Sequence, residues 1–160
     1  MAKIYLLLGS NMGDRMVYLE RARQKIAQHI GHPEAVSSVF ETEPWGFTHQ
    51  TNFLNQLVIA VTLLQPDEAM EKIHLIEQQL GRTREDKQFT ARIIDIDILF
   101  YDKKIITTGN LVIPHPLLEK RRFALEPLAE VEPGLVHPVH KKTVARLLEE
   151  CDDRMKVTKL

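Results

Sequence analysis

The chain has 160 residues, of which 44% are hydrophobic and 27% are charged, and its formal net charge at pH 7 is -1. These values are ordinary for a soluble globular protein and fit one domain over residues 1–160. A chain so close to neutral has no overall electrostatic attraction to nucleic acid or to a membrane surface.

Two local features favour a cytoplasmic protein. The apolar run Ile4–Leu8 is shorter than the core of a signal peptide and far shorter than a membrane span. Cys151 is the single cysteine, so no internal disulfide can form and a reducing compartment is expected. We therefore expect a cytoplasmic monomer without nucleic-acid or membrane partners.

Hydrophobic periodicity and turn residues predict alternating strands and helices. In chain order they are a strand over 3–9, a helix over 14–30 closed by Gly31 and Pro33, strands over 36–42 and 53–63, a helix over 66–80, a charged surface loop over 82–91 and a strand over 92–101. The order β-α-β-β-α-β is that of a ferredoxin-like α+β fold, an α/β sandwich.

A C-terminal extension of hairpin and helices follows this core. The hairpin is predicted to turn through Asp102-Lys103-Lys104, and helical segments to cover 117–131 and 143–150. A proline-rich loop, Pro114-His115-Pro116, precedes the first helical segment.

The strand RIIDIDILFY at 92–101 contains two carboxylates in an otherwise apolar segment. Because side chains alternate along a strand, Asp95 and Asp97 share one face. The apolar residues predicted on the other face are Ile94, Ile96, Ile98 and Phe100. Carboxylates two residues apart lie roughly 6–7 Å apart at their bases and repel unless a cation intervenes. The pattern favours a site for hard cations such as Mg²⁺, and the alternative is a face exposed to water.

Basic residues gather in the loop that precedes this strand and just after that loop, at Arg82, Arg84, Lys87 and Arg92. Beside an acidic metal site, guanidinium groups are suited to the charge of a polyphosphate. A solvated charged loop has the same composition, and Arg92 is the residue that directly adjoins the strand.

Two histidine motifs and one glycine-containing turn are further candidates for binding phosphate or metal. His115, followed by Arg121 and Arg122, offers a further phosphate contact or a structural histidine between prolines. His137 and His140 lack a third metal ligand and are interpreted as loop residues. The turn 9–15 lacks the Lys-Ser/Thr of a P-loop, so side chains and metal would have to hold any phosphate.

Several segments keep the order and residues of a known family. They are LGSNMGDR at 8–15, SSVFETEPWGF at 37–47, FLN at 53–55, LGRTR at 80–84, RIIDIDILFYD at 92–102, VIPHP at 112–116 and RRFALEPL at 121–128. Together they resemble the hydroxymethyldihydropterin pyrophosphokinases of folate biosynthesis. The resemblance implies transfer of diphosphate from ATP to the hydroxymethyl group of a dihydropterin, with release of AMP.

The resemblance also implies roles for individual residues. Asp95 and Asp97 would hold two Mg²⁺ ions that bridge the ATP phosphates, and Arg82 and Arg92 would be catalytic. The ATP subsite would comprise Arg84, Phe89, Ile98, His115 and Arg121. The pterin subsite would comprise Thr42, Pro44, Trp45, Gly46, Phe53, Asn55 and Phe123, with the ring stacked between the two phenylalanines.

The sequence departs from the family pattern at two places. Phe89-Thr90-Ala91-Arg92 stands where Trp-x-Pro-Arg is usual, and Phe53 stands where Tyr is common. Two rival interpretations differ in function. A polymerase-β-type nucleotidyltransferase also combines Gly-Ser with Asp-x-Asp, but close together in sequence, whereas Ser10 and Asp95 are far apart here. A ferredoxin-like sensor would bind a small ligand without consuming ATP and gives no reason for acids beside arginines.

Overall fold

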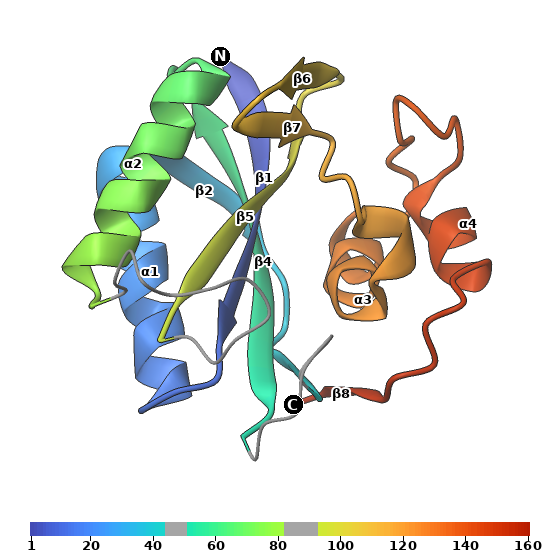
Figure 1. The fold of residues 1–160 in the computed structure, drawn as a ribbon, viewed down its shortest axis with the longest axis horizontal. Coiled ribbons are helices and arrows are strands. Elements are labelled where there is room, and N and C mark those ends of the chain that lie inside the picture. The colour runs from blue at the N-terminus through green and yellow to red at the C-terminus, as the bar shows by residue number, and fades with distance from the viewer. Residues whose placement is uncertain (44–50, 82–92) are drawn as a thin grey trace.

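The computed structural model describes residues 1–43, 51–81 and 93–160. A six-stranded sheet runs through the centre in the order β5-β1-β4-β3-β8, and β2 also pairs with β4 (Figure 1). The strands are β1 (Ala2–Ser10), β2 (Gly31–Val36), β3 (Phe40–Thr42), β4 (Phe53–Thr62), β5 (Asp95–Tyr101) and β8 (Val157–Lys159). These neighbours pair antiparallel. The predicted ferredoxin-like α+β core is confirmed.

Helices cover both faces of the sheet (Figure 1). On one face lie α1 (Arg15–His29) and α2 (Pro66–Gln79), and on the other lie α3 (Arg122–Val131) and α4 (Val144–Glu149). A first core cluster fills the α1–α2 side, and its members include Leu8, Leu19, Ile26, Ile73, Ile76 and Ile96. A second core cluster fills the α3–α4 side, and its members include Leu7, Leu57, Leu125, Leu128 and Leu147.

The helices of the core begin where the sequence predicts. The Asp14 side chain accepts a hydrogen bond from the Val17 N–H, which caps α1. The Glu68 carboxylate accepts a bond of 2.8 Å from the Gln65 N–H at the start of α2. Both bonds satisfy backbone donors that a helix start or its cap leaves open.

The single strand predicted over 36–42 is wrong, because two strands, β2 and β3, lie in this region. β2 begins at Gly31 and contains Pro33, the two residues predicted to close the preceding helix. A Cβ at Gly31 would lie 2.1 Å from the Val61 carbonyl oxygen, so glycine permits the close approach of β2 to β4. The register with β4 shifts between Pro33 and Ala35, and proline is tolerated at such an irregularity.

The prediction that side chains alternate strictly between the two faces of β5 is also wrong at one residue. Tyr5 pairs with Phe100 and Leu6 pairs with Ile98, so Leu99 is an extra residue, as in a β-bulge. As a result Leu99 and Phe100 both belong to the second core cluster. Phe100 was predicted on the face of Ile98, which lies in the first cluster.

The C-terminal extension differs from the prediction in detail. The hairpin is formed by β6 (Ile106–Thr108) and β7 (Leu111–Ile113), beyond the predicted turn at 102–104. The helical segment over 117–131 is divided into a 3₁₀ turn, η1 (Leu118–Lys120), and α3. The predicted helix over 143–150 is confirmed as α4, whereas β8 was not predicted.

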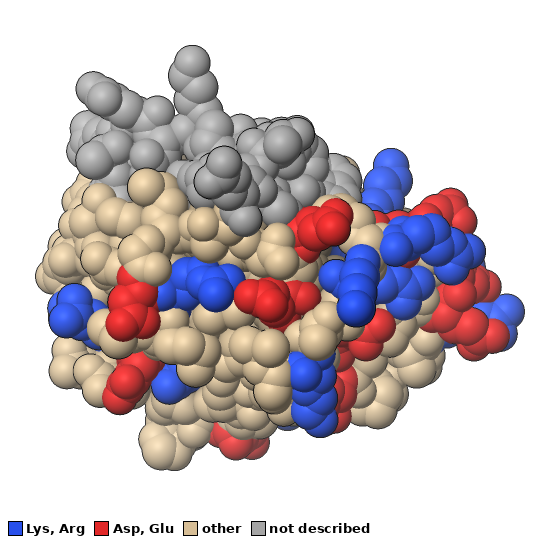
Figure 2. All heavy atoms as spheres, turned by 90° about the horizontal axis from the view of Figure 1, so that it is seen from below, with Lys and Arg blue, Asp and Glu red and all other residues tan. Residues whose placement is uncertain are grey.

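Charges of both signs are mixed over the face shown in Figure 2, and they are densest on the side where α4 lies in Figure 1. In the described ranges, no helix has the length and apolar content needed to cross a bilayer.

Candidate active site

The sheet register brings several of the predicted site residues in the described ranges together at one end of the sheet. Gly9, near the end of β1, pairs with Asp95 on one side and with Asn55 on the other. Asn55 in turn pairs with Phe40 on β3, two residues before Thr42. This end lies opposite the β6–β7 hairpin, at the bottom of Figure 1. Residues distant in sequence therefore line one edge of the fold.

The two aspartates emerge on the α3 side of β5. Ile94, Ile96 and Ile98 all belong to the first core cluster, on the α1–α2 side. Alternation therefore directs Asp95 and Asp97 to the opposite face, where both are half-buried. Leu7, whose partner on β5 is Asp97, lies in the second cluster and marks the same face.

Gly9 lies on β1 between Asp95 of β5 and Asn55 of β4, where a side chain would meet close neighbours. A Cβ built on Gly9 would lie 3.0 Å from Asn55 Oδ1 and 3.6 Å from Phe53 Cδ1. Phe53, Asn55 and the missing side chain of Gly9 are therefore on one face. Since Asp95 pairs with Gly9, any side chain at position 9 would stand between the carboxylates and the amide.

The predicted pterin residues in the described ranges are two polar residues, Thr42 and Asn55, and two aromatic residues, Phe53 and Phe123. Asn55 and Thr42 are both buried, and Asn55 Nδ2 donates to Thr42 Oγ1 over 3.2 Å. This bond fixes the orientation of the amide. Phe53 and Phe123 are partly buried, and Phe123 packs against the second core cluster from α3.

His115 is held as a neutral imidazole by its surroundings. Its backbone N–H donates to the Leu99 carbonyl, and its Nδ1 accepts from the Leu117 N–H over 3.2 Å. Burial, followed by the positive charge of Arg121, lowers the pKa of His115 to about 4, while Asp95 acts in the opposite direction. With Nδ1 as acceptor, the proton of the neutral ring resides on Nε2, which is a donor.

Arg121 lies between the end of η1 and the start of α3. Only 8% of its surface is exposed, and its guanidinium carbon lies 5.6 Å from the centre of the Phe123 ring. Arg121 lowers the pKa of His115 and Asp95 raises it, so the positive and the negative charge act on the imidazole in opposite directions.

The remaining predicted residues are placed as follows. Arg82, Arg84, Phe89, Arg92, Pro44, Trp45 and Gly46 lie outside the described residues. The side chain of Ile98 is buried in the first core cluster, away from the face of the aspartates. Ile98 can therefore offer only its backbone to this face.

Sequence reasoning missed Gly9 and Glu77. Glu77 is 6% exposed, and its Oε2 accepts a 2.9 Å hydrogen bond from the Ile96 N–H, between the aspartates. A signal for it existed, because Glu77 interrupts the apolar helical stripe of Ile73, Ile76 and Leu80. The role of Gly9 depends on strand register and had no local signal.

The donor set suits a cation that is shared with a phosphate. Within the described ranges, no group of three or more His, Cys, Asp and Glu residues could hold a metal ion. Two half-buried carboxylates on one face can supply part of an octahedral oxygen shell, which Mg²⁺ commonly completes with phosphate and water. The residues present therefore fit Mg²⁺ bound together with a nucleotide.

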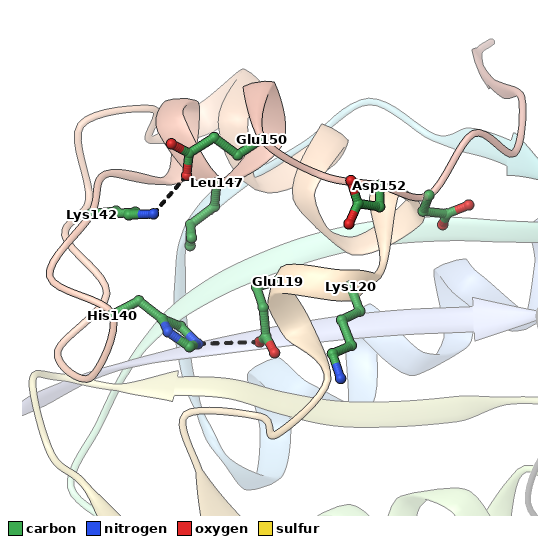
Figure 3. A pocket seen from close by; sticks show the side chains of 8 residues that line it. Glu119, Lys120, His140, Lys142, Leu147, Glu150 and Asp152 are labelled. Carbon is green, nitrogen blue, oxygen red and sulfur yellow. Dashed lines mark hydrogen bonds and ion pairs between the residues drawn. The ribbon is translucent and has the colours of Figure 1, made fainter.

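A separate hollow lies on the C-terminal extension, between η1 and the segment 140–153 (Figure 3). Its charges engage each other, since Lys142 pairs with Glu150 at 2.7 Å and His140 with Glu119 at 3.4 Å. No residue of the predicted site is among those that line it. We therefore place the candidate active site at the sheet end and not in this hollow.

His137 is a buried loop residue, as predicted. Its Nδ1 accepts from the N–H groups of Val139 and His140, both at 3.1 Å, and its ring meets Phe100 edge-on. Burial, followed by the charge of His140, lowers the pKa of His137 to about 4.

Comparison with known proteins shows that most of the chain matches one family. Residues 5–133 match the family model described as 7,8-dihydro-6-hydroxymethylpterin-pyrophosphokinase. A 2-amino-4-hydroxy-6-hydroxymethyldihydropteridine pyrophosphokinase of Aquifex aeolicus is 43% identical over 150 residues, which cover 94% of this chain and 92% of that one. An enzyme of the same name from Bacillus subtilis is 44% identical over 128 residues, covering 79% and 76%.

Solved structures agree on the fold. The HPPK-DHPS of Plasmodium falciparum, as an S436F/A437G/A613T triple mutant with STZ-DHP, superposes with a TM-score of 0.78 at 18% identity. The match covers 93% of this chain but 43% of that one, so this chain spans less than half of the solved protein. With a family model over residues 5–133 and relatives above 40% identity, the chain belongs to the 7,8-dihydro-6-hydroxymethylpterin-pyrophosphokinase family.

Proposed function

We propose that the sheet end at which Asp95, Gly9 and Asn55 meet is where this chain transfers diphosphate from ATP to 6-hydroxymethyl-7,8-dihydropterin. As a member of its family, the chain is an ATP-dependent diphosphotransferase of folate biosynthesis. The observation that supports this location is the strand register, which sets Gly9 between Asp95 and Asn55.

The chemistry defines what the site must do. The hydroxymethyl oxygen of the pterin attacks the β-phosphorus of ATP, and the bond from that phosphorus to the oxygen bridging the α-phosphate breaks. AMP leaves with that oxygen, and the hydroxyl proton is lost. The site must therefore align the hydroxymethyl oxygen with the bond that breaks, and it must neutralise the negative charge of the phosphates.

Asp95 and Asp97 would hold Mg²⁺, and we propose two ions. When bound, Mg²⁺ neutralises phosphate charge and orients the transferring group. The support is the shared, half-buried position of the carboxylates on the α3 side of β5. Arg82 and Arg92 would stabilise the charge that rearranges during transfer.

The nucleotide would be held by positively charged and by uncharged residues. Arg121 supplies a fixed positive charge, and the pKa of His115, lowered to about 4, keeps its Nε2–H as a neutral donor at physiological pH. Arg84 and Phe89 complete the proposed ATP subsite, and Ile98 would contribute backbone.

The pterin would be recognised by stacking and by a fixed amide. A flat heteroaromatic ring suits two aromatic faces and a few oriented polar partners. Phe53 and Phe123 would supply the faces. Asn55, oriented by its bond to Thr42, would read the polar edge together with backbone of Pro44, Trp45 and Gly46.

The direct test is to incubate the protein with ATP, Mg²⁺ and 6-hydroxymethyl-7,8-dihydropterin and to follow AMP. We expect AMP and pterin diphosphate in equal amounts. Transfer of AMP to an added nucleic acid, with release of free diphosphate, would instead support the nucleotidyltransferase. Pterin binding without ATP consumption would support the sensor. We also propose that residues 1–160 form one domain and that the enzyme acts as a cytoplasmic monomer, because ATP is the proposed donor and every residue assigned to the two subsites belongs to this chain.

A further inference from the structure

Glu77 is a carboxylate placed on the buried face of α2. It lies one turn from Ile73 and adjoins Ile76, both of which are in the first core cluster, and it is 6% exposed. Burying a carboxylate among apolar side chains is unfavourable unless hydrogen bonds compensate it. Packing alone therefore gives no reason for Glu at this position.

The partner of Glu77 lies in the acidic strand. Its Oε2 accepts from the Ile96 N–H over 2.9 Å. β5 is the last strand of the sheet order, and β1 is its strand neighbour. The N–H groups on the outer side of an edge strand lack partners from the sheet, and a buried one must be satisfied in another way. Glu77 satisfies the Ile96 N–H with a charge-assisted bond.

The position of that bond links α2 to the aspartates. Ile96 separates Asp95 from Asp97, and its side chain points into the first core cluster. The neighbouring side chains leave the strand on the opposite face. A bond that fixes the peptide of Ile96 therefore also fixes the directions in which both carboxylates leave the strand.

We propose that Glu77 is a positioning residue that holds the edge strand β5 so that Asp95 and Asp97 present their carboxylates together to Mg²⁺. This inference rests on the proposed metal role of the two aspartates. Glu77 itself acts from behind the strand, on the α2 side, and touches neither cation nor substrate.

Three variants and a control test the proposal. Glu77→Gln keeps an oxygen that can accept from Ile96, Glu77→Asp keeps the charge but shortens the arm, and Glu77→Leu removes the acceptor. Glu71→Gln is the matched control, because Glu71 is an exposed acid on the same helix. Each protein is first checked for fold by circular dichroism and thermal melting.

The first measurement needs no metal. Amide hydrogen exchange at Ile96 in the metal-free protein should be at least about tenfold faster in Glu77→Leu and Glu77→Asp than in the wild type. Glu77→Gln and Glu71→Gln should exchange at close to the wild-type rate.

The second measurement is a titration with Mn²⁺, detected by electron paramagnetic resonance in the presence of a non-hydrolysable ATP analogue. We expect Glu77→Leu and Glu77→Asp to need about tenfold more Mn²⁺ for half-saturation, with rescue in Glu77→Gln. The KM for the pterin should remain within twofold, because the proposed pterin residues Thr42, Phe53 and Asn55 lie on β3 and β4 and not on β5.

The outcomes separate this inference from the proposed function. If Asp97→Ala binds Mn²⁺ as the wild type does, the metal role itself is wrong. If Asp97→Ala loses Mn²⁺ but Glu77→Leu and Glu77→Asp do not, the positioning role is overturned and the metal role stands. Should Glu77→Leu fail to fold, the contrast between Glu77→Asp and Glu77→Gln decides, and equal Mn²⁺ affinity in that pair overturns the proposal.

Discussion

Replacing Gly9 by alanine should weaken pterin binding and leave nucleotide binding nearly intact. The added methyl group would lie 3.0 Å from Asn55 Oδ1 and 3.6 Å from Phe53 Cδ1. The first distance is shorter than ordinary contacts of a Cβ, so Asn55 must move by a few tenths of an ångström. Asn55 is buried and bonded to Thr42 Oγ1 over 3.2 Å, so its displacement disturbs the amide that the pterin would meet.

The magnitude follows from this overlap. Inserting a methyl group into a well-packed site typically costs about 1–3 kcal/mol. If that cost falls on the pterin complex, its dissociation constant rises roughly 5- to 150-fold. The close contacts of the new methyl are with Asn55 and Phe53 on β4, and none of the three nearest atoms belongs to Asp95. The affinity for nucleotide and Mg²⁺ should therefore change less than twofold.

Calorimetric titration can measure the two affinities separately. A non-hydrolysable ATP analogue is titrated first, and the pterin is then titrated into the saturated complex. Gly134→Ala is the matched control, because a Cβ at Gly134 meets nothing within 4 Å. Two results would contradict a selective effect of Gly9→Ala on the pterin. One is a pterin affinity within twofold of the wild type in the folded variant, and the other is an equal loss of pterin and nucleotide affinity.

Four further predictions follow from the site and its surroundings. Asp97→Ala should lower AMP release by several orders of magnitude without unfolding the protein, and a chelator should abolish release; near-normal turnover would contradict the metal assignment. Arg92→Ala should lower kcat by roughly 10²–10³; a change confined to the KM for ATP would indicate a ground-state clamp. Because the pKa of His137 is about 4 when folded and about 6.5 when unfolded, the unfolded state binds the proton first as pH falls. As pH falls from 6.5 to 4, this difference should lower the free energy of unfolding by up to about 3 kcal/mol. In urea titrations, His137→Asn should make the free energy of unfolding depend less on pH. An unchanged pH dependence in this variant would contradict a lowered pKa of His137. Tryptophan emission from Trp45 should shift when pterin and an ATP analogue bind together, with Trp45→Phe as control; a constant signal at saturation would place the indole away from the site.

Local patterns were sufficient for the order of the core elements and for the acidic face. Helical spacing and capping residues act within a few positions of each other, so α1 and α2 appear where they were predicted. Alternation is likewise a property of the strand itself. Asp95 and Asp97 therefore had to share a face, whichever strands became their neighbours.

Other features arise from contacts between distant segments. Gly31 and Pro33 resemble helix terminators, yet they lie in β2 because β4 passes close by and the register shifts there. The short strand β8 exists through its pairing with β3. Phe100 faces the second core cluster because a bulge opposite β1 reverses the alternation. No window of neighbouring residues contains these partners.

The active-site end shows the same division. The residues proposed to hold metal and phosphate could be named from sequence, because charged side chains carry that chemistry themselves. Those proposed to hold the pterin were named through the family resemblance. Their arrangement depends on the register, which sets Gly9 between Asp95 and Asn55 and brings Glu77 to the backbone of Ile96. A glycine and a glutamate acquire these roles only when the sheet forms, since both roles consist of distances to other strands.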